Sequence, residues 1–135
     1  MLLGLDFGLK NIGIAITDDE EKIALAYDSV RNRYSLHKIE KIIISRNIKS
    51  VVIGYPVKDN EEGFVAQQAR LYGKQLEHEF GLEIFLYNEF YTTQLAIQNL
   101  REQGYSPKSV EQKKDAEAAR IILQTYLDNM VQNTN

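Results

Sequence analysis

The amino-acid sequence predicts a single α/β domain, with helices packed on the faces of a mixed sheet. Its 135 residues are enough for one hydrophobic core, and 44% hydrophobic with 26% charged residues is the composition of a globular protein. Three strand-like segments come first, and helix-like and strand-like segments then alternate along the chain. We therefore expect an antiparallel meander extended by parallel strands, in one domain over residues 1–135.

The first half of the chain is predicted to hold the meander, a helix and one buried strand. Residues 1–7 are mostly apolar, as in a strand covered on both faces, and residues 11–17 alternate in the way of a strand. A run of four acids then indicates a turn before a third strand over residues 22–30. In residues 34–47 the apolar positions recur with the period of a helix, and residues 50–55 form a short apolar strand.

The second half is predicted to alternate helices and strands, with glycines at two helix ends. The elements are, in order, a helix over 62–80 that Gly81 ends, a strand over 82–87, a helix over 92–103 that Gly104 ends, and a last helix to about residue 129. This last helix is expected to begin at Ser106-Pro107, or at Ser109, where the residues through Gln112 match a capping box.

Several classes of protein are excluded by what the sequence lacks. The absence of cysteine excludes disulfides, thiolate zinc sites and cysteine nucleophiles. The apolar runs are too short to span a membrane, and the N-terminus carries Asp6 instead of the basic residues of a signal peptide. A cytoplasmic protein without a membrane partner is therefore expected.

The distribution of charge is more informative than the net charge of −3. Between Arg31 and Lys49 there are six basic residues and one acid, Glu40. This stretch is either a solvated helix face or a local binding surface for a polyanion.

Asp6 is a carboxylate in or at the end of an apolar strand, where burial is costly unless the charge is paired or bound. Gly8 and Gly13 follow it, and their missing side chains allow another backbone or a ligand to approach closely. Two interpretations are open: Asp6 caps the turn after the strand, or it belongs to a metal or phosphate site at the first hairpin.

Glu89 and Asp115 are two further acids in informative positions. Glu89 follows an apolar strand, where ligand sites gather in α/β sheets, although a solvated or helix-capping acid would occupy the same place. Asp115 shares a helical stripe with apolar residues, among them Ala118 and Ala119, whose small side chains allow the helix to lie close to the sheet. The alternative is an aspartate at the stripe edge that reaches solvent.

If these three acids converge, their chemistry fits a divalent metal. Mg²⁺ and Mn²⁺ prefer carboxylate and water ligands, and such ions activate a water molecule in phosphodiester cleavage. His37 and His78 lie on separate predicted helices without ligand spacing, so a histidine-metal site is not expected.

Four stretches of the chain together resemble the YqgF/RuvX family, a ribonuclease H-like group related to the RuvC Holliday-junction resolvases. The opening motif spans Leu5 to Ala15, and the second is Val52-Ile53-Gly54-Tyr55-Pro56. Asn88 to Thr93 stands at the place of the family's Asp-Glu-Arg-x-Ser-Thr motif, and Lys113 to Leu123 resembles its closing helix. The resemblance covers essentially the whole chain.

This resemblance implies a ribonuclease H-like fold, with a five-stranded mixed sheet and helices on both faces. It also implies a nuclease that matures the 5′ end of pre-16S ribosomal RNA, with Asp6, Glu89 and Asp115 as catalytic and metal-binding acids. The chain departs from the family pattern at three positions near these acids. Asn88 and Phe90 replace the family's Asp and Arg, and Ala118 stands where RuvC-type sites have a fourth acid.

Basic residues are expected to bind the nucleic acid. Lys10, with the backbone amides near Gly8, is expected to hold the scissile phosphate, while Arg31, Lys38 and Lys41 track the backbone away from the site.

Two other functions remain beside an rRNA nuclease: a DNA resolvase of the Holliday-junction type, or a non-catalytic RNA-binding module of ribosome assembly. The opening motif also resembles a phosphate loop of actin-like ATPases, but 135 residues leave no room for their second domain. The choice between RNA and DNA, the metal, and the choice between a monomer and a weak homodimer stay open.

Overall fold

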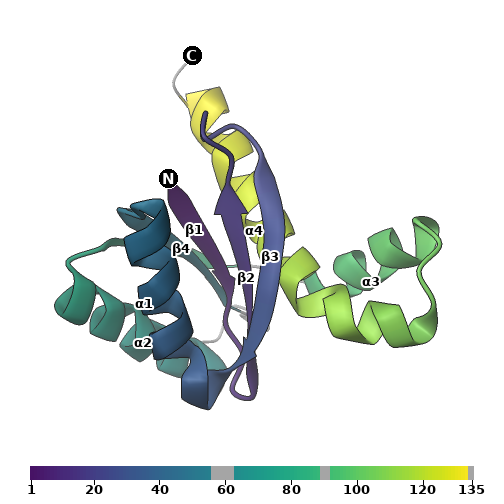
Figure 1. Ribbon diagram of the computed structural model, residues 1–135, viewed down its shortest axis with the longest axis horizontal. Helices are drawn as coiled ribbons and strands as arrows, with labels where there is room; N and C mark the ends of the chain where they lie inside the picture. Colours follow the sequence, from purple (N-terminus) through teal and green to yellow (C-terminus); the bar gives the residue numbers. More distant parts are fainter. Residues whose placement is uncertain (56–62, 89–91, 134–135) are drawn as a thin grey trace.

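The computed structural model describes residues 1–55, 63–88 and 92–133, without the side chains of 88 and 131–133. Five strands form one sheet in the order β3-β2-β1-β4-β5 (Figure 1). The strands are β1 (Leu2–Asp6), β2 (Asn11–Thr17), β3 (Ala24–Arg31), β4 (Ser50–Tyr55) and β5 (Glu83–Asn88). The pairs β1–β2 and β2–β3 are antiparallel, and the pairs β1–β4 and β4–β5 are parallel. The predicted meander with added parallel strands is confirmed.

The helices also follow the prediction, with small differences at their ends. They are a short 3₁₀ helix (Asn32–Tyr34), α1 (Ser35–Arg46), α2 (Phe64–Phe80), α3 (Thr92–Glu102) and α4 (Pro107–Asn133). The predicted first residue of the second helix, Glu62, lies outside the described residues.

Hydrogen bonds explain two element starts: that of the third strand, which differs from the prediction, and that of the last helix, which is the first of the two predicted. The third strand begins at Ala24 instead of Lys22, because the Asp18 carboxylate accepts the backbone amides of Lys22 and Ile23 and holds them in the turn. The last helix begins at Pro107, and Ser106 Oγ accepts a hydrogen bond from the Ser109 amide at 3.2 Å. Ser106 therefore caps this helix, and the capping box that starts at Ser109 does not. This helix also continues past residue 129, to Asn133.

The helices form two layers, one on each face of the sheet (Figure 1). On one side, α1 and α2 cover an apolar cluster that includes Leu3 and Leu5 of β1. On the other side, α4 lies along the sheet and α3 packs against α4. Because side chains alternate along a strand, Gly4 and Asp6 belong to the α4 face.

Glycines in three neighbouring strands allow α4 to lie very close to the sheet. A β-carbon at Gly4 would be 2.7 Å from Leu123 Cβ, and one at Gly54 would collide with the Ile122 side chain. A β-carbon at Gly13 would collide with the carbonyl oxygen of Asp115. The close approach expected at Gly13 is therefore made by the chain's own last helix. Within the described part of the chain, no helix is both long enough and apolar enough to cross a membrane.

Candidate nuclease site

Asp6 lies in a row of in-register residues that crosses the sheet. As the last residue of β1, it pairs with Gly13 of β2 and with Gly54 of β4, and Gly13 pairs in turn with Ser29 of β3. In-register side chains on neighbouring strands share a face. Because β-carbons at Gly13 and Gly54 would meet α4, the half-buried Asp6 side chain also points to the α4 face.

Asp115 reaches the same row from α4. Its carbonyl oxygen lies against Gly13, and its Oδ2 accepts a hydrogen bond from Ser29 Oγ at 3.3 Å. The helical spacing predicted this inward orientation, and the next residues of the stripe, Ala118 and Ala119, are fully buried. Two of the three acids singled out in the sequence therefore lie on one face of the sheet, on either side of Gly13.

The third acid, Glu89, lies outside the described residues, as does Phe90. The strand that precedes Glu89 ends at Asn88, which pairs with Tyr55 at the carboxyl end of β4. Within the described residues there is no group of three acids or histidines placed to hold a metal. Asp6 and Asp115 are the described members of the predicted set.

Three predicted phosphate-binding residues lie at the end of the sheet where Asp6 stands. The loop between β1 and β2 is joined to the end of β3, because Asn32 donates its backbone amide to Lys10 O at 2.8 Å and its side-chain amide to Gly8 O at 2.7 Å. The exposed side chains of Lys10 and Arg31 therefore belong to this end of the molecule. A β-carbon at Gly8 would meet the carbonyl oxygen of Asn11. The close approach expected at Gly8 is therefore also made by the chain's own backbone.

Lys38 and Lys41 lie elsewhere, on α1, in the layer opposite Asp115 (Figure 1). Lys38 Nζ is 2.6 Å from Asp28 Oδ2, and this hydrogen bond raises the pKa of Lys38. Lys41 is exposed. The structure thus places these two lysines on the opposite side of the sheet from the carboxylates of Asp6 and Asp115.

Ser29 and Glu117 were not singled out in the sequence. Ser29 is an ordinary strand serine whose role depends on pairing with Gly13, which no local pattern reveals. Glu117 is only 6% exposed and binds Arg120 through both carboxylate oxygens, one of them 2.8 Å from Nη2. Its neighbour Ala118, at the position of the fourth acid in RuvC-type sites, is fully buried.

Comparison with known proteins finds relatives over nearly the whole chain. The family model RuvX, described as a Holliday junction resolvase, matches residues 1–129. A protein of Anaeromyxobacter sp. named "Putative pre-16S rRNA nuclease" is 36% identical, over 93% of this chain and 95% of its own length. A protein of the same name from Novosphingobium aromaticivorans is 37% identical, over 94% of this chain and 84% of its own length.

Solved structures with similar folds are more distant in sequence. The RuvC protein of T. thermophilus, in complex with a Holliday junction substrate, has a TM-score of 0.59 at 15% identity, over 97% of this chain and 95% of its own. The fowlpox virus Holliday junction resolvase has a TM-score of 0.53 at 14% identity, over 95% of this chain and 98% of its own. These likenesses confirm the ribonuclease H-like fold, and the family match with the two relatives shows that the chain belongs to the RuvX family.

Proposed function

We propose that this protein is a nuclease that hydrolyses phosphodiester bonds with a carboxylate-held divalent metal, and that it processes the 5′ end of pre-16S ribosomal RNA. One observation carries the nuclease assignment: Asp6 and Asp115 lie on the same face of the sheet, on either side of Gly13, with Ser29 fixing the second carboxylate. The choice of substrate is supported by the names of the two bacterial relatives, which match nearly the whole chain.

The donor set fits Mg²⁺ or Mn²⁺. Asp6 and Asp115 offer carboxylate oxygens, which hard divalent cations prefer, and Glu89 is the residue we propose as their third member. When bound there, the metal would lower the pKa of a water molecule and stabilise charge on the phosphate. The chain contains no cysteine, and its two histidines, His37 and His78, are not among the residues assigned to the site.

The protein's own residues bind and orient the substrate. Lys10 and Arg31, exposed at the Asp6 end of the sheet, attract the phosphate backbone of the nucleic acid. Ser29 holds the Asp115 carboxylate in one orientation, so this side chain loses less conformational freedom when the substrate binds. An enzyme that processes precursor rRNA in a bacterium would work in the cytoplasm, as the sequence led us to expect.

The test is cleavage of a 5′-leader fragment of pre-16S rRNA by the wild type and by Asp6→Asn, with Mg²⁺, Mn²⁺ or EDTA. We expect cleavage that needs metal and falls at least about 100-fold in Asp6→Asn, because the substitution removes a charged ligand. Asp19→Asn, in the exposed turn between β2 and β3, is the matched control and should cleave like the wild type. Equal cleavage by Asp6→Asn, folded as judged by circular dichroism, would contradict the assignment.

A DNA junction is the second candidate substrate, and the structural likeness to RuvC bound to a Holliday junction favours it. The same assay therefore includes a four-way DNA junction, and the ranking of the two substrates decides between them. A non-catalytic RNA-binding module is the third candidate, favoured by Ala118 at the place of a fourth acid. Salt-sensitive RNA binding without cleavage under any metal condition would support it over both nuclease functions.

A further inference from the structure

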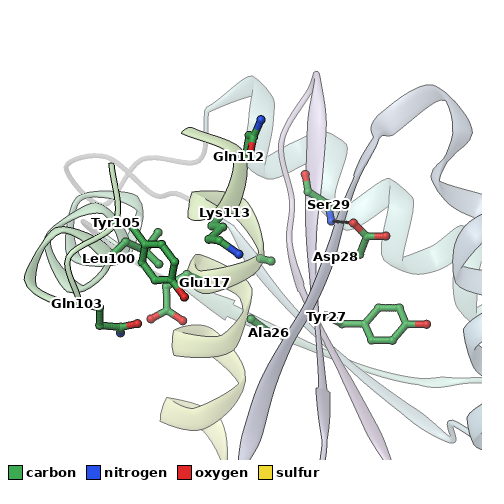
Figure 2. Close-up of a pocket in the computed structure, with 11 residues that line it drawn as sticks. Ala26, Tyr27, Asp28, Ser29, Leu100, Gln103, Tyr105, Gln112, Lys113 and Glu117 are labelled. Carbon is green, nitrogen blue, oxygen red and sulfur yellow. Dashed lines mark hydrogen bonds between the residues drawn. The ribbon is translucent and has the colours of Figure 1, made fainter. Parts of the chain in front are cut away.

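A groove of about 400 Å³ lies between the edge strand β3 and the connection from α3 to α4 (Figure 2). This volume falls within the range of about 300–1,000 Å³ that is usual for small-molecule sites. Its lining mixes apolar groups, such as Leu100 and Ala116, with polar groups, such as Gln103 and Gln112. Lys113, Ala116 and Glu117 of its lining belong to the closing-helix motif, and the remaining lining residues belong to no sequence motif.

The groove contains an aromatic surface with a cation beside it. Tyr105 is 41% exposed, and the Nζ of Lys113 lies 5.1 Å from the centre of its ring. Among the described residues, no carboxylate forms an ion pair with Lys113, and its ammonium lies over the face of the Tyr105 ring. An exposed tyrosine ring next to a lysine is the combination that binds single-stranded nucleic acid, by stacking a base and attracting its phosphate.

The groove adjoins the candidate nuclease site at Ser29. Ser29 forms part of its wall and also donates the hydrogen bond to Asp115. Lys113 and Asp115 are two residues apart on α4 and so point to different sides of the helix, with Lys113 lining the groove and Asp115 bonded to Ser29. A strand with one phosphate at the two carboxylates would therefore place a neighbouring nucleotide at the groove.

The charges of the lining favour a base over a phosphate in the groove. Glu117 lines it with a carboxylate that is 6% exposed and already neutralised by Arg120. A phosphate next to this pair would be repelled by the Glu117 carboxylate and is therefore expected on the Lys113 side of the groove, whereas a neutral base meets donors and acceptors in Gln103 and Gln112.

We propose that this groove takes an unpaired nucleobase of a single-stranded segment of the substrate, stacked on Tyr105, with Lys113 bound to its phosphate. The proposal deepens the proposed function, on which the nature of the ligand rests. It predicts that the protein prefers substrates with an extrahelical or unpaired nucleotide beside the bond to be cleaved.

The test uses a short single-stranded RNA that carries 2-aminopurine, whose fluorescence falls when it stacks on an aromatic ring. The RNA is titrated with the protein in EDTA, so that no cleavage occurs. We expect quenching with the wild type and with Tyr105→Phe, which keeps the ring. Tyr105→Ala should lose the quenching and bind the strand roughly ten-fold more weakly, since one base–aromatic stack is lost.

Phe64→Ala is the matched control. Phe64 is an aromatic residue that is 61% exposed, but it lies on α2, on the opposite face of the sheet from α4 and outside the groove (Figure 1). This variant should bind and quench like the wild type, and binding of a fully paired RNA should be unchanged in both alanine variants. Binding without quenching by the wild type, or equal effects of Phe64→Ala and Tyr105→Ala, would overturn the proposal. Because the measurement is made without metal, its result is independent of the cleavage assay that tests the nuclease function.

Discussion

Ser29 Oγ donates a hydrogen bond to Asp115 Oδ2 at 3.3 Å, across 86 residues of sequence. This bond connects the edge strand β3 to α4 over Gly13, the residue that pairs with both Ser29 and Asp6. In the proposed site, a carboxylate held in this way loses less rotational freedom when the metal binds.

Ser29→Ala should therefore weaken metal binding without removing a ligand. Loss of a hydrogen-bonding partner behind a metal ligand commonly costs about 10- to 100-fold in affinity, and because this bond is partly buried and 3.3 Å long we expect Ser29 at the lower limit. We expect cleavage to need about ten-fold more Mg²⁺ while the rate at saturating metal falls little. Ser45→Ala, on α1, should leave the metal dependence unchanged. An unaltered metal dependence in Ser29→Ala would show that the bond does not orient Asp115.

Gly13→Ala should destabilise the fold, because the new β-carbon would collide with the carbonyl oxygen of Asp115. We expect a loss of at least about 3 kcal/mol in the free energy of unfolding, measured by urea titration, as α4 is forced away from the sheet. Gly63→Ala is the control, since nothing lies within 4 Å of its β-carbon position. Equal stability of the two variants would contradict the close contact between α4 and β2.

The buried ring of Tyr72 should make stability depend on pH in the alkaline range. Burial, supported by the charge of Glu79 and opposed by the hydrogen bond with Ser35, raises the pKa of Tyr72 to about 12. A folded-state pKa above the usual value of 10.0 means that the contribution is complete below pH 10 and is lost as pH rises toward 12.

This loss corresponds to roughly 2–3 kcal/mol for one group. Tyr72→Phe should abolish it, although the variant is expected to be about 1 kcal/mol less stable at pH 7, where the 2.6 Å bond to Ser35 is missing. The measurement is urea unfolding of both proteins from pH 7 to 12. A constant difference between them over this range would show that Tyr72 titrates normally.

The ion pair between Glu117 and Arg120 should contribute to stability, because the Glu117 carboxylate is buried. Arg120→Leu leaves the Glu117 carboxylate, 6% exposed, without its cation, and should lower the free energy of unfolding by about 3 kcal/mol. The double variant Glu117→Leu, Arg120→Leu should recover most of this loss, because no buried charge remains. If the double variant is as unstable as the single one, the loss comes from packing and not from the unpaired charge.

The strands and helices were predictable because their signals are local. Residues 11–17 and 50–55 alternate or are continuously apolar, and the structure forms β2 and β4 over those same residues. The inward position of Asp115 was also predictable, since the periodicity of a long helix fixes which residues share its stripe.

The rest of the site depends on how distant segments meet, and no local pattern carries that information. Ser29 has significance only because β3 pairs with β2 in the register that places it beside Gly13. Lys38 and Lys41 fall in a basic stretch near Arg31, but the chain turns after β3 and α1 covers the opposite face of the sheet from Asp115. The groove forms between β3 and α4, which lie about 80 residues apart in sequence and meet only in the folded protein.

The most direct test of the account is a double-mutant cycle on metal binding, with Asp6→Asn, Asp115→Asn and the double variant. Binding of Mn²⁺ is measured by titration calorimetry, at one pH and salt concentration for all four proteins. If the two carboxylates hold one ion, each single variant should lose most of the affinity, and the double variant should lose far less than the sum of the two. Additive losses, or Mn²⁺ binding that both single variants retain, would contradict a shared metal site between Asp6 and Asp115.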